Sequence, residues 1–293
     1  PVLLTAAAGI PDRVRLLDGT GSEVPYQVTQ DLAVGPKVWE REAVAGVSLP
    51  AFGYTTLTWE QGEPAVEPTT PAASPEDSVL DNGVIQLRFD GGRLAAIATP
   101  QGEYPAPEGM AWSLLRAYDV DPAGPLHVGE IRGTEDVCCE SSRIEERGPV
   151  RWRHVAVGTI GPHRVTLRTT LLAGEARAEF NAAIDWRGAD GFLAVHWPMP
   201  FEGGLTGDVP FGAEMKDLDA EPYGPLPEHR GGNIERLRPG LFYARSFVSL
   251  SDCRQSVTYV SHDGDRYYLR DAEGGTLAQV LINSIRRVEQ GWE

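Results

Sequence analysis

Residues 164–201 read RVTLRTTLLAGEARAEFNAAIDWRGADGFLAVHWPMPF, and this stretch decides the fold class. Apolar and polar side chains alternate in its first segment, which places Val165 and Leu171 on one side of a pleat and Arg168 on the other. The same period of two resumes in AEFNAAIDW (178–186), and FLAVHW follows after a second Gly-containing turn. Such alternation is typical of strands that bury one face, and turns this short join antiparallel neighbours. The stretch therefore predicts a three-stranded antiparallel meander.

The rest of the chain shows the same kind of local pattern. A meander buries only one face, so further strands must cover it. Short alternating runs recur on both sides of the meander, for example VIQLRF at residues 84–89. Residues 111–118 also fit a helix, but a strand followed by a loop is favoured there. With no convincing amphipathic helix and no repeat of fixed period, the sequence predicts an all-β fold.

Composition divides the chain into two β units. Residues 63–77 are rich in Pro, Ala and Glu and poor in large apolar side chains, whereas period-two patterns lie on both sides. Such a composition is typical of a linker or a long surface connection. We predict a small β-sandwich unit over residues 1–62, a Pro-rich linker over 63–77 and a larger β domain over 78–293.

The overall charge argues against several kinds of partner. The chain has 26 basic and 42 acidic residues, a formal net charge of −16, and 41% hydrophobic residues, which suit a globular protein. A surface this acidic repels nucleic-acid phosphates and anionic lipids, and no apolar run approaches a transmembrane length. We therefore expect no nucleic-acid partner and no membrane partner. Cys138, Cys139 and Cys253 lack metal-binding spacing, which predicts reduced thiols in a cytoplasmic protein.

No catalytic or metal-binding motif stands out. The six histidines lack the spacings that mark zinc sites, and His262-Asp-Gly-Asp is interpreted first as a polar turn. A retaining glycosidase needs two carboxyl groups about 5–5.5 Å apart, but no motif selects such a pair. There is also no G-x-S-x-G, P-loop or dinucleotide fingerprint. We therefore predict no catalytic residue, no bound metal and no cofactor in this chain.

Several segments taken in order point to a known family. They are DGTGSEVPYQV (18–28) with SLPAFGYTTL (48–57), LDNGVIQLRFDGGRLAAIATPQG (80–102), IDWRGADGFLAVHWPMPF (184–201) with VPFG (209–212), and SFVSLSD (246–252) through LAQVLINSIRR (277–287). Together they resemble the C-terminal β portion of glycoside hydrolase family 38, the retaining α-mannosidases. The order and spacing of these segments across nearly all of the chain carry the resemblance.

The resemblance implies both a fold and a role. The fold would be a small N-terminal β sandwich followed by a large antiparallel supersandwich related to galactose mutarotase. The family's catalytic domain, with its zinc ligands and nucleophilic aspartate, and a helical bundle would lie N-terminal to this region, with Pro1 about where the bundle gives way to β structure. Zinc is expected only in that domain. This chain would then be a non-catalytic part of the glycoside hydrolase, covering the catalytic domain and contributing loops to carbohydrate binding.

One segment is a candidate for contact with carbohydrate. Some family members carry a Trp/Tyr-Asp segment on a loop near the catalytic pocket, and RAYDVD (116–121) resembles a diverged version of it. By this resemblance Tyr118 would stack on or hydrogen-bond to a sugar, and Asp119 would hold a hydroxyl group. The alternative is a surface turn with a half-buried tyrosine.

Two other functions fit the same fold: a free-standing carbohydrate-binding module, and a mutarotase-like sugar enzyme that uses a His and a Glu.

If the chain evolved against a catalytic domain, it should expose an apolar docking face, which would also permit a homo-oligomer. Residues 202–240 are the candidate, with Phe211, Met215, Leu218, Tyr223 and Leu226. Alternatively, this loop seals an edge of its own sandwich.

Overall fold

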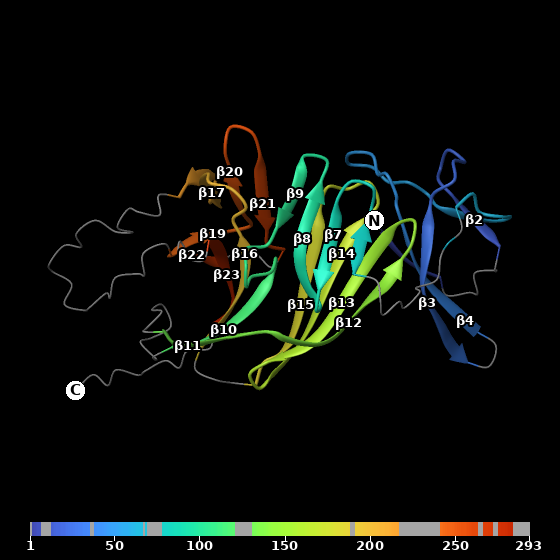
Figure 1. The fold of residues 1–293 in the computed structure, drawn as a ribbon. Helices are drawn as coiled ribbons and strands as arrows, with labels where there is room; N and C mark the ends of the chain where they lie inside the picture. Colours follow the sequence, from blue (N-terminus) through green and yellow to red (C-terminus); the bar gives the residue numbers. More distant parts are fainter. Residues whose placement is uncertain are drawn as a thin grey trace, which may run out of the picture.

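The computed structural model describes residues 2–6, 13–35, 38–66, 68, 78–120, 131–187, 191–216, 241–262, 266–271 and 275–283. Every regular element in these ranges is a β-strand, and every strand pair is antiparallel (Figure 1). The predicted fold class, all-β with large antiparallel sheets, is confirmed. Within the described ranges, no helix is long and apolar enough to span a membrane.

Two small sheets form the N-terminal unit, drawn in blue in Figure 1. Their strands are β1 (Val2–Ala6), β2 (Val14–Leu17), β3 (Tyr26–Gly35), β4 (Val38–Ala45) and β5 (Thr58–Gln61). One sheet has the order β1-β4-β3, and the other pairs β2 with β5. A core of their own holds the unit together: the ring of Tyr26 meets that of Trp59 edge-on at 4.9 Å, and the Tyr26 hydroxyl donates to the Val14 carbonyl at 3.0 Å.

The larger part of the chain begins with two facing four-stranded sheets. The first contains, in spatial order, β6 (Val79–Asp81), β7 (Gln86–Asp90), β8 (Arg93–Thr99) and β9 (Gly102–Pro105). The second contains β12 (Cys138–Arg147), β13 (Arg151–Ile160), β14 (His163–Leu172) and β15 (Ala178–Asp185). Leu87 and Phe89 of the first sheet share a core with Val165 and Leu171 of the second, so the face predicted from the alternating pattern is the buried one.

Two further sheets lie at the end opposite the N-terminal unit (Figure 1). Six strands form one of them: β10 (Leu114–Val120), β11 (Ile131–Asp136), β16 (Phe192–Pro198), β19 (Leu241–Ala244), β22 (Arg266–Asp271) and β23 (Thr276–Asn283), in the order β11-β10-β16-β23-β22-β19. The other contains β17 (Gly204–Val209), β18 (Gly212–Met215), β20 (Phe247–Ser251) and β21 (Ser256–Val260), in the order β18-β17-β20-β21. Leu205 and Leu250 of this sheet and Leu193 of the six-stranded sheet belong to the same core as the first sandwich.

The predicted three-stranded meander is wrong in its third strand. β14 pairs with β15 as expected, but β16 lies between β10 and β23 in the six-stranded sheet. All seven residues of β16 are buried, which a central strand covered on both faces requires. Trp197 of β16 contacts the ring of Phe180 of β15 at 5.1 Å, so these two strands pack through their side chains and do not pair through their backbones.

A buried polar joint connects the N-terminal unit to the large sandwich. Gln27 of β3, which is fully buried, donates to Glu146 of β12 at 3.3 Å and accepts from the Arg151 backbone N–H at 2.9 Å. Arg151 and Arg153 of β13 both donate to the Glu146 carboxylate, at 2.5–2.8 Å. A Cβ atom at Gly148 would lie 2.1 Å from Oε1 of Gln27, so glycine is needed for this close approach. The joint we define as Gln27, Glu146, Arg151 and Arg153 therefore fixes β3 against β12 and β13.

The two larger of the three hydrophobic clusters among the described residues divide near the predicted boundary. One cluster draws on residues 14–59 and the other on residues 80–282. Most of the predicted linker, namely residue 67 and residues 69–77, lies outside the described residues. The division into 1–62, 63–77 and 78–293 therefore stays a prediction.

Candidate functional site

Tyr118 and Asp119 lie next to each other in β10, so their side chains point to opposite faces of the six-stranded sheet. Tyr118 is buried, whereas the Asp119 side chain is 59% exposed and pairs with Arg132 at 2.8 Å. The structure therefore does not bring the two together as one sugar-binding pair. The segment is a strand and not the surface turn of the alternative interpretation. Whether either side chain contacts carbohydrate stays a prediction.

Tyr118 belongs to a buried hydrogen-bonded cluster on the face of the six-stranded sheet that points away from the main core. Its hydroxyl is 2.5 Å from Nε2 of His196, and Nδ1 of His196 is 3.0 Å from the hydroxyl of Thr276. The Tyr118 ring stacks on Phe192, with centroids 4.3 Å apart. We call these four residues the tyrosine–histidine cluster. Both imidazole nitrogens are engaged, which fixes the orientation of the ring.

The strand register explains how the cluster assembles. Tyr118 of β10 is directly opposite Phe192 of β16, and His196 of β16 is opposite Ala278 of β23. Directly opposite residues share one face of a sheet. Tyr118 and His196 are 78 positions apart in the sequence, and Thr276 is 80 positions beyond His196. Only the pairing of three distant strands brings them together.

An ion pair lies beside this cluster. Arg116 is two residues before Tyr118 on the same face of β10, and it donates to both carboxylate oxygens of Asp136 in β11, at 2.6 and 3.0 Å. The hydrogen bonds to Asp136 raise the pKa of Arg116 above its usual value. A phenol and an imidazole in contact are able to exchange a proton. His196 is 0% exposed, however, so in this chain the cluster is closed to a substrate.

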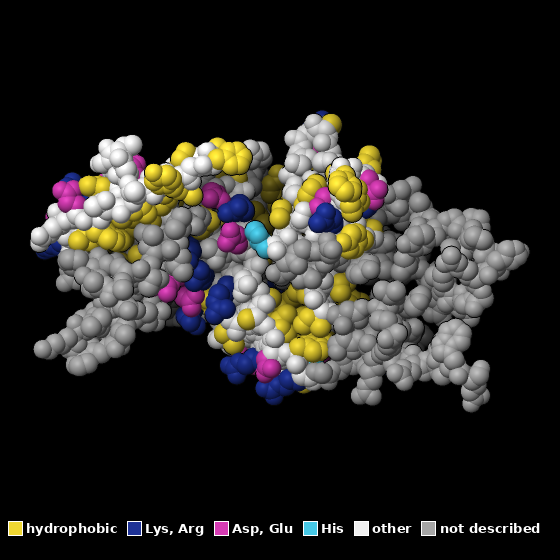
Figure 2. All heavy atoms as spheres, turned by 180° about the vertical axis from the view of Figure 1, so that it is seen from behind, with side chains coloured by type: hydrophobic (Ala, Val, Ile, Leu, Met, Phe, Trp, Pro, Cys, Tyr) yellow, Lys and Arg dark blue, Asp and Glu magenta, His cyan; other side chains and the backbone are white. Residues whose placement is uncertain are grey.

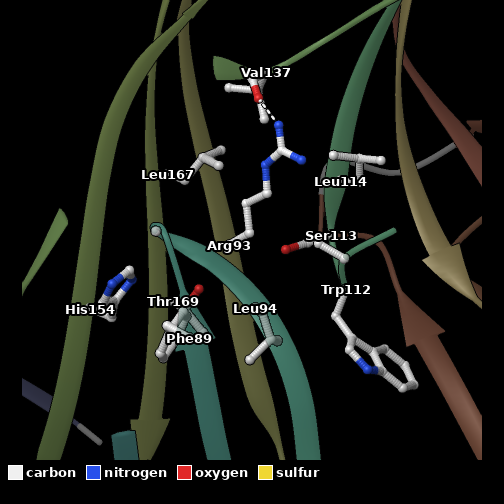
Figure 3. Close-up of a pocket in the computed structure, with 12 residues that line it drawn as sticks. Phe89, Arg93, Leu94, Trp112, Ser113, Leu114, Val137, His154, Leu167 and Thr169 are labelled. Atoms are coloured by element: carbon white, nitrogen blue, oxygen red, sulfur yellow. Dashed lines mark hydrogen bonds between the residues drawn. The ribbon is translucent and has the colours of Figure 1, made fainter. Parts of the chain in front are cut away.

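A small cavity opens between the two sheets of the first sandwich (Figure 3). Figure 3 shows the Arg93 side chain between Leu167 and Leu114, with His154, Thr169 and Phe89 on one side and Trp112 on the other. Arg93 donates to the Val137 carbonyl at 2.7 Å. A volume of about 20 Å³ gives room for roughly one water molecule, so the cavity is far too small for a sugar.

Three of the four histidines in the described ranges are buried in structural positions. His154 stacks on Phe89 with centroids 3.7 Å apart, and burial lowers its pKa to about 4. His163 stacks on Trp186 at 3.8 Å, and its Nδ1 accepts the Arg187 backbone N–H. His196 belongs to the tyrosine–histidine cluster. His262 is exposed, whereas His127 and His229 lie outside the described residues.

No cluster of three or more His, Cys, Asp or Glu side chains that could hold a metal occurs among the residues the structure describes. Cys138, Cys139 and Cys253 are free thiols, and burial raises the pKa of Cys139. The metal ligands that the family resemblance places in another domain thus have no counterpart in the described part of this chain. The described residues do not fit a zinc site.

Two of the five apolar side chains proposed for a docking face are at the surface. Phe211 and Met215 are exposed on the β17–β18 hairpin. Leu218, Tyr223 and Leu226 lie outside the described residues. Large exposed apolar side chains also occur at Leu49, Phe52, Tyr54, Val66 and Val260. Figure 2 shows hydrophobic side chains at the surface along the upper edge of that view.

Sequence reasoning missed the partner of Tyr118. Alternation along the strand would place only one of His196 and Trp197 in a core. The structure buries both, Trp197 towards the main core and His196 on the opposite face with Tyr118. The usable signal was the absence of charge throughout FLAVHW, which fits a strand covered on both faces.

Two solved structures resemble this fold over 94% of the chain. One is described as an α-mannosidase from Enterococcus faecalis V583, with a TM-score of 0.66 and 14% sequence identity. The other is a protein in the glycosyl hydrolase family 38 from Enterococcus faecalis, with a TM-score of 0.65 and 14% identity. No model of a known protein family matches the sequence, and no curated protein does.

The chain spans 35% and 36% of the length of these two proteins. At 14% identity the similarity establishes the fold. The resemblance drawn from the sequence segments is confirmed at that level, with this chain corresponding to about a third of a family 38 protein.

Proposed function

We propose that this chain is the non-catalytic β region of an α-mannosidase-like glycoside hydrolase. Its role is to cover a catalytic portion and to contribute loops to the carbohydrate-binding pocket. The observation that carries the proposal is the pair of coverages: 94% of this chain corresponds to only 35–36% of proteins described as an α-mannosidase and a family 38 glycosyl hydrolase. A fold that makes up a third of such a protein is expected to act together with the other two thirds.

The site geometry supports a role other than catalysis. A retaining glycosidase needs two carboxyl groups about 5–5.5 Å apart on either side of an open pocket. The described cavity between the first two sheets has room for about one water, and the residues lining it include no carboxylate. In the tyrosine–histidine cluster, His196 bonds to Tyr118 and Thr276 and is fully buried. We therefore assign the chemistry, and any zinc it needs, to the catalytic portion.

In this proposal Tyr118 has a structural role: it supports the face of the six-stranded sheet on which Arg116 lies. It is held rigidly by Phe192 and His196, and Arg116 beside it is partly exposed. Arg116 and Asp136 on this face keep partial contact with solvent, and the exposed Thr134 of β11 lies directly opposite Tyr118. A catalytic portion that packs against this face would bring its pocket next to Arg116.

The test is to produce the complete reading frame that contains this chain and to assay it with an aryl α-mannoside beside the isolated chain. The proposal predicts turnover by the complete protein and none by the isolated chain. Turnover by the isolated chain that is lost on changing one acidic residue would contradict it. Tight binding of a mannan by the isolated chain, with no activity in the complete protein, would favour the free-standing carbohydrate-binding module.

A further inference from the structure

Two surface turns share the same unusual local structure. In the N-terminal unit Pro50-Ala51-Phe52-Gly53 forms a turn closed by a hydrogen bond from Gly53 N–H to the Pro50 carbonyl at 3.1 Å. In the large domain Val209-Pro210-Phe211-Gly212 joins β17 to β18, with Val209 and Gly212 paired. In both turns the third residue is phenylalanine with positive φ, 56° for Phe52 and 70° for Phe211.

Phenylalanine is a poor choice for this position on local grounds. A turn that needs positive φ at its third residue normally places Gly or Asn there, because a Cβ atom is strained in that backbone region. In each turn a glycine follows immediately, so the aromatic ring occupies the position that glycine would suit best. The ring gains no burial against the part of the chain that the structure describes, since Phe52 is 111% exposed and Phe211 is 108% exposed. Strain without a local gain points to a gain made elsewhere.

The surroundings of Phe52 have the composition of an interface. Residues 43–59 contain no charged side chain, although 23% of the whole chain is charged and its net charge is −16. Leu49 and Tyr54 are exposed beside Phe52 in this segment. The centres of protein–protein interfaces are depleted in charge and enriched in aromatic residues. Met215 is likewise exposed on the hairpin that carries Phe211.

Hydrogen bonds of Asp208 also fix the hairpin that carries the Phe211 turn. Asp208, at the end of β17, accepts hydrogen bonds from the backbone N–H groups of Ser246 and Phe247 at 2.8 and 3.0 Å and from the Ser246 hydroxyl at 2.5 Å. These bonds fix the start of the hairpin against β20. An anchor presented in a fixed position loses less conformational entropy on binding.

We propose that the Phe52 and Phe211 turns are two docking anchors for polypeptide of the same enzyme that lies outside these 293 residues. The solved structures with this fold belong to chains of which it makes up 35–36%, so such a chain has two thirds of its length to cover these rings. The identity of the partner rests on the proposed function above. The strain and the exposure of the two turns are observed independently of that function. The absence of charge in residues 43–59 and the exposed aliphatic side chains of Leu49 and Met215 beside the rings favour a protein surface over a sugar.

The first test uses the 293-residue chain alone. Phe52→Gly and Phe211→Gly each relieve positive-φ strain and remove a fully exposed ring, so each is expected to raise the thermal midpoint by about 1–3 °C. Val260→Ser is the matched control, since Val260 is exposed in a regular strand and its replacement relieves no such strain. A lower midpoint in both glycine variants would show that the rings support the chain's own fold, and would overturn the proposal.

The second test measures binding of the chain to the separately produced remainder of its reading frame. Each glycine variant is expected to weaken this binding by about tenfold or more, and Val260→Ser by less than twofold. Unchanged affinity in both glycine variants would refute the anchors while leaving the proposed function standing. Failure of the unmodified chain to bind the remainder would refute both. Loss of binding to mannan, with binding to the remainder unchanged, would instead assign the rings to carbohydrate.

Discussion

At the scale of single residues, the hydroxyl of Tyr118 is 2.5 Å from Nε2 of His196, and neither side chain has appreciable contact with solvent. Tyr118→Phe removes this hydroxyl, so the buried Nε2 of His196 loses its hydrogen bond to Tyr118. We expect a loss of about 1–3 kcal/mol in the free energy of unfolding, measured by urea denaturation. Asp119→Asn, which affects only an exposed ion pair, should change it by less than about 0.5 kcal/mol.

The same two variants separate a structural tyrosine from a sugar-binding one. If Tyr118 contacts carbohydrate in the α-mannosidase-like protein that we propose, Tyr118→Phe in the complete reading frame will change KM for a mannoside with little change in stability. Loss of stability with an unchanged KM is the expected result, because the hydroxyl is already engaged by His196.

His154 makes stability depend on pH. Burial lowers its pKa to about 4, so the folded protein keeps His154 neutral at pH values where the unfolded chain, with a pKa near 6.5, binds a proton. Stability is therefore fully present above about pH 6.5 and falls as the pH falls towards 4. We expect this one histidine to account for about 2–3 kcal/mol of that loss.

Urea denaturation at several pH values measures this effect. His154→Gln should flatten the dependence between pH 6.5 and 4. Burial also lowers the pKa of His163, against the opposing effect of Asp185, so some slope of the same sign will remain. An unaltered slope in His154→Gln would show that this imidazole becomes protonated within the fold.

At the scale of elements, the joint between β3 and the β12–β13 pair depends on one carboxylate. Glu146 accepts from Arg151, Arg153 and Gln27, and its side chain is almost fully buried. Glu146→Gln removes the counter-charge of Arg151 and leaves Arg153 only its 3.7 Å contact with Glu145, and we expect a loss of about 2–4 kcal/mol. The lower part of that range applies if solvent reaches Arg153, whose side chain is 24% exposed.

The neighbouring Glu145 provides the control. It lies on the same strand, is more exposed, and its contacts to Arg143 and Arg153 are longer, at 3.5 and 3.7 Å. Glu145→Gln should cost less than about 0.5 kcal/mol. Equal effects of the two substitutions on the midpoint of urea unfolding would mean that the joint contributes nothing beyond general charge balance.

β14, β15 and β16 show what a strand pattern does and does not reveal. The alternation in 164–186 correctly predicted β14, β15 and their buried face, because period-two burial is a local property. It failed to predict the sheet to which β16 belongs. A turn between two strands also permits a change of sheet, and the choice depends on β10 and β23, which are far away in the sequence. The only local sign that β16 joins the other sheet is that all of its residues, including FLAVHW, are buried, as in a central strand.

At the scale of the whole molecule, the order of several weak segments was more informative than any motif. Each segment alone fits an ordinary hairpin, but together they predicted a fold that two solved structures, one described as an α-mannosidase and one as a family 38 protein, share over 94% of the chain. The candidate site was less predictable. Tyr118 was singled out by resemblance, but its partners His196 and Thr276 come from strands that the sequence does not connect to it. Positive φ at Phe52 and Phe211 has no reliable sequence signal, since it contradicts the usual preference for glycine.

The central claim is that these 293 residues complete a catalytic portion without being catalytic. The most direct measurement is hydrolysis of an aryl α-mannoside while this chain is titrated into the separately produced remainder of its reading frame. We predict no turnover by the chain alone and a saturable rise in the activity of the remainder as the chain is added. Turnover by the chain alone, or a remainder whose activity is unchanged at saturating chain, would contradict the claim.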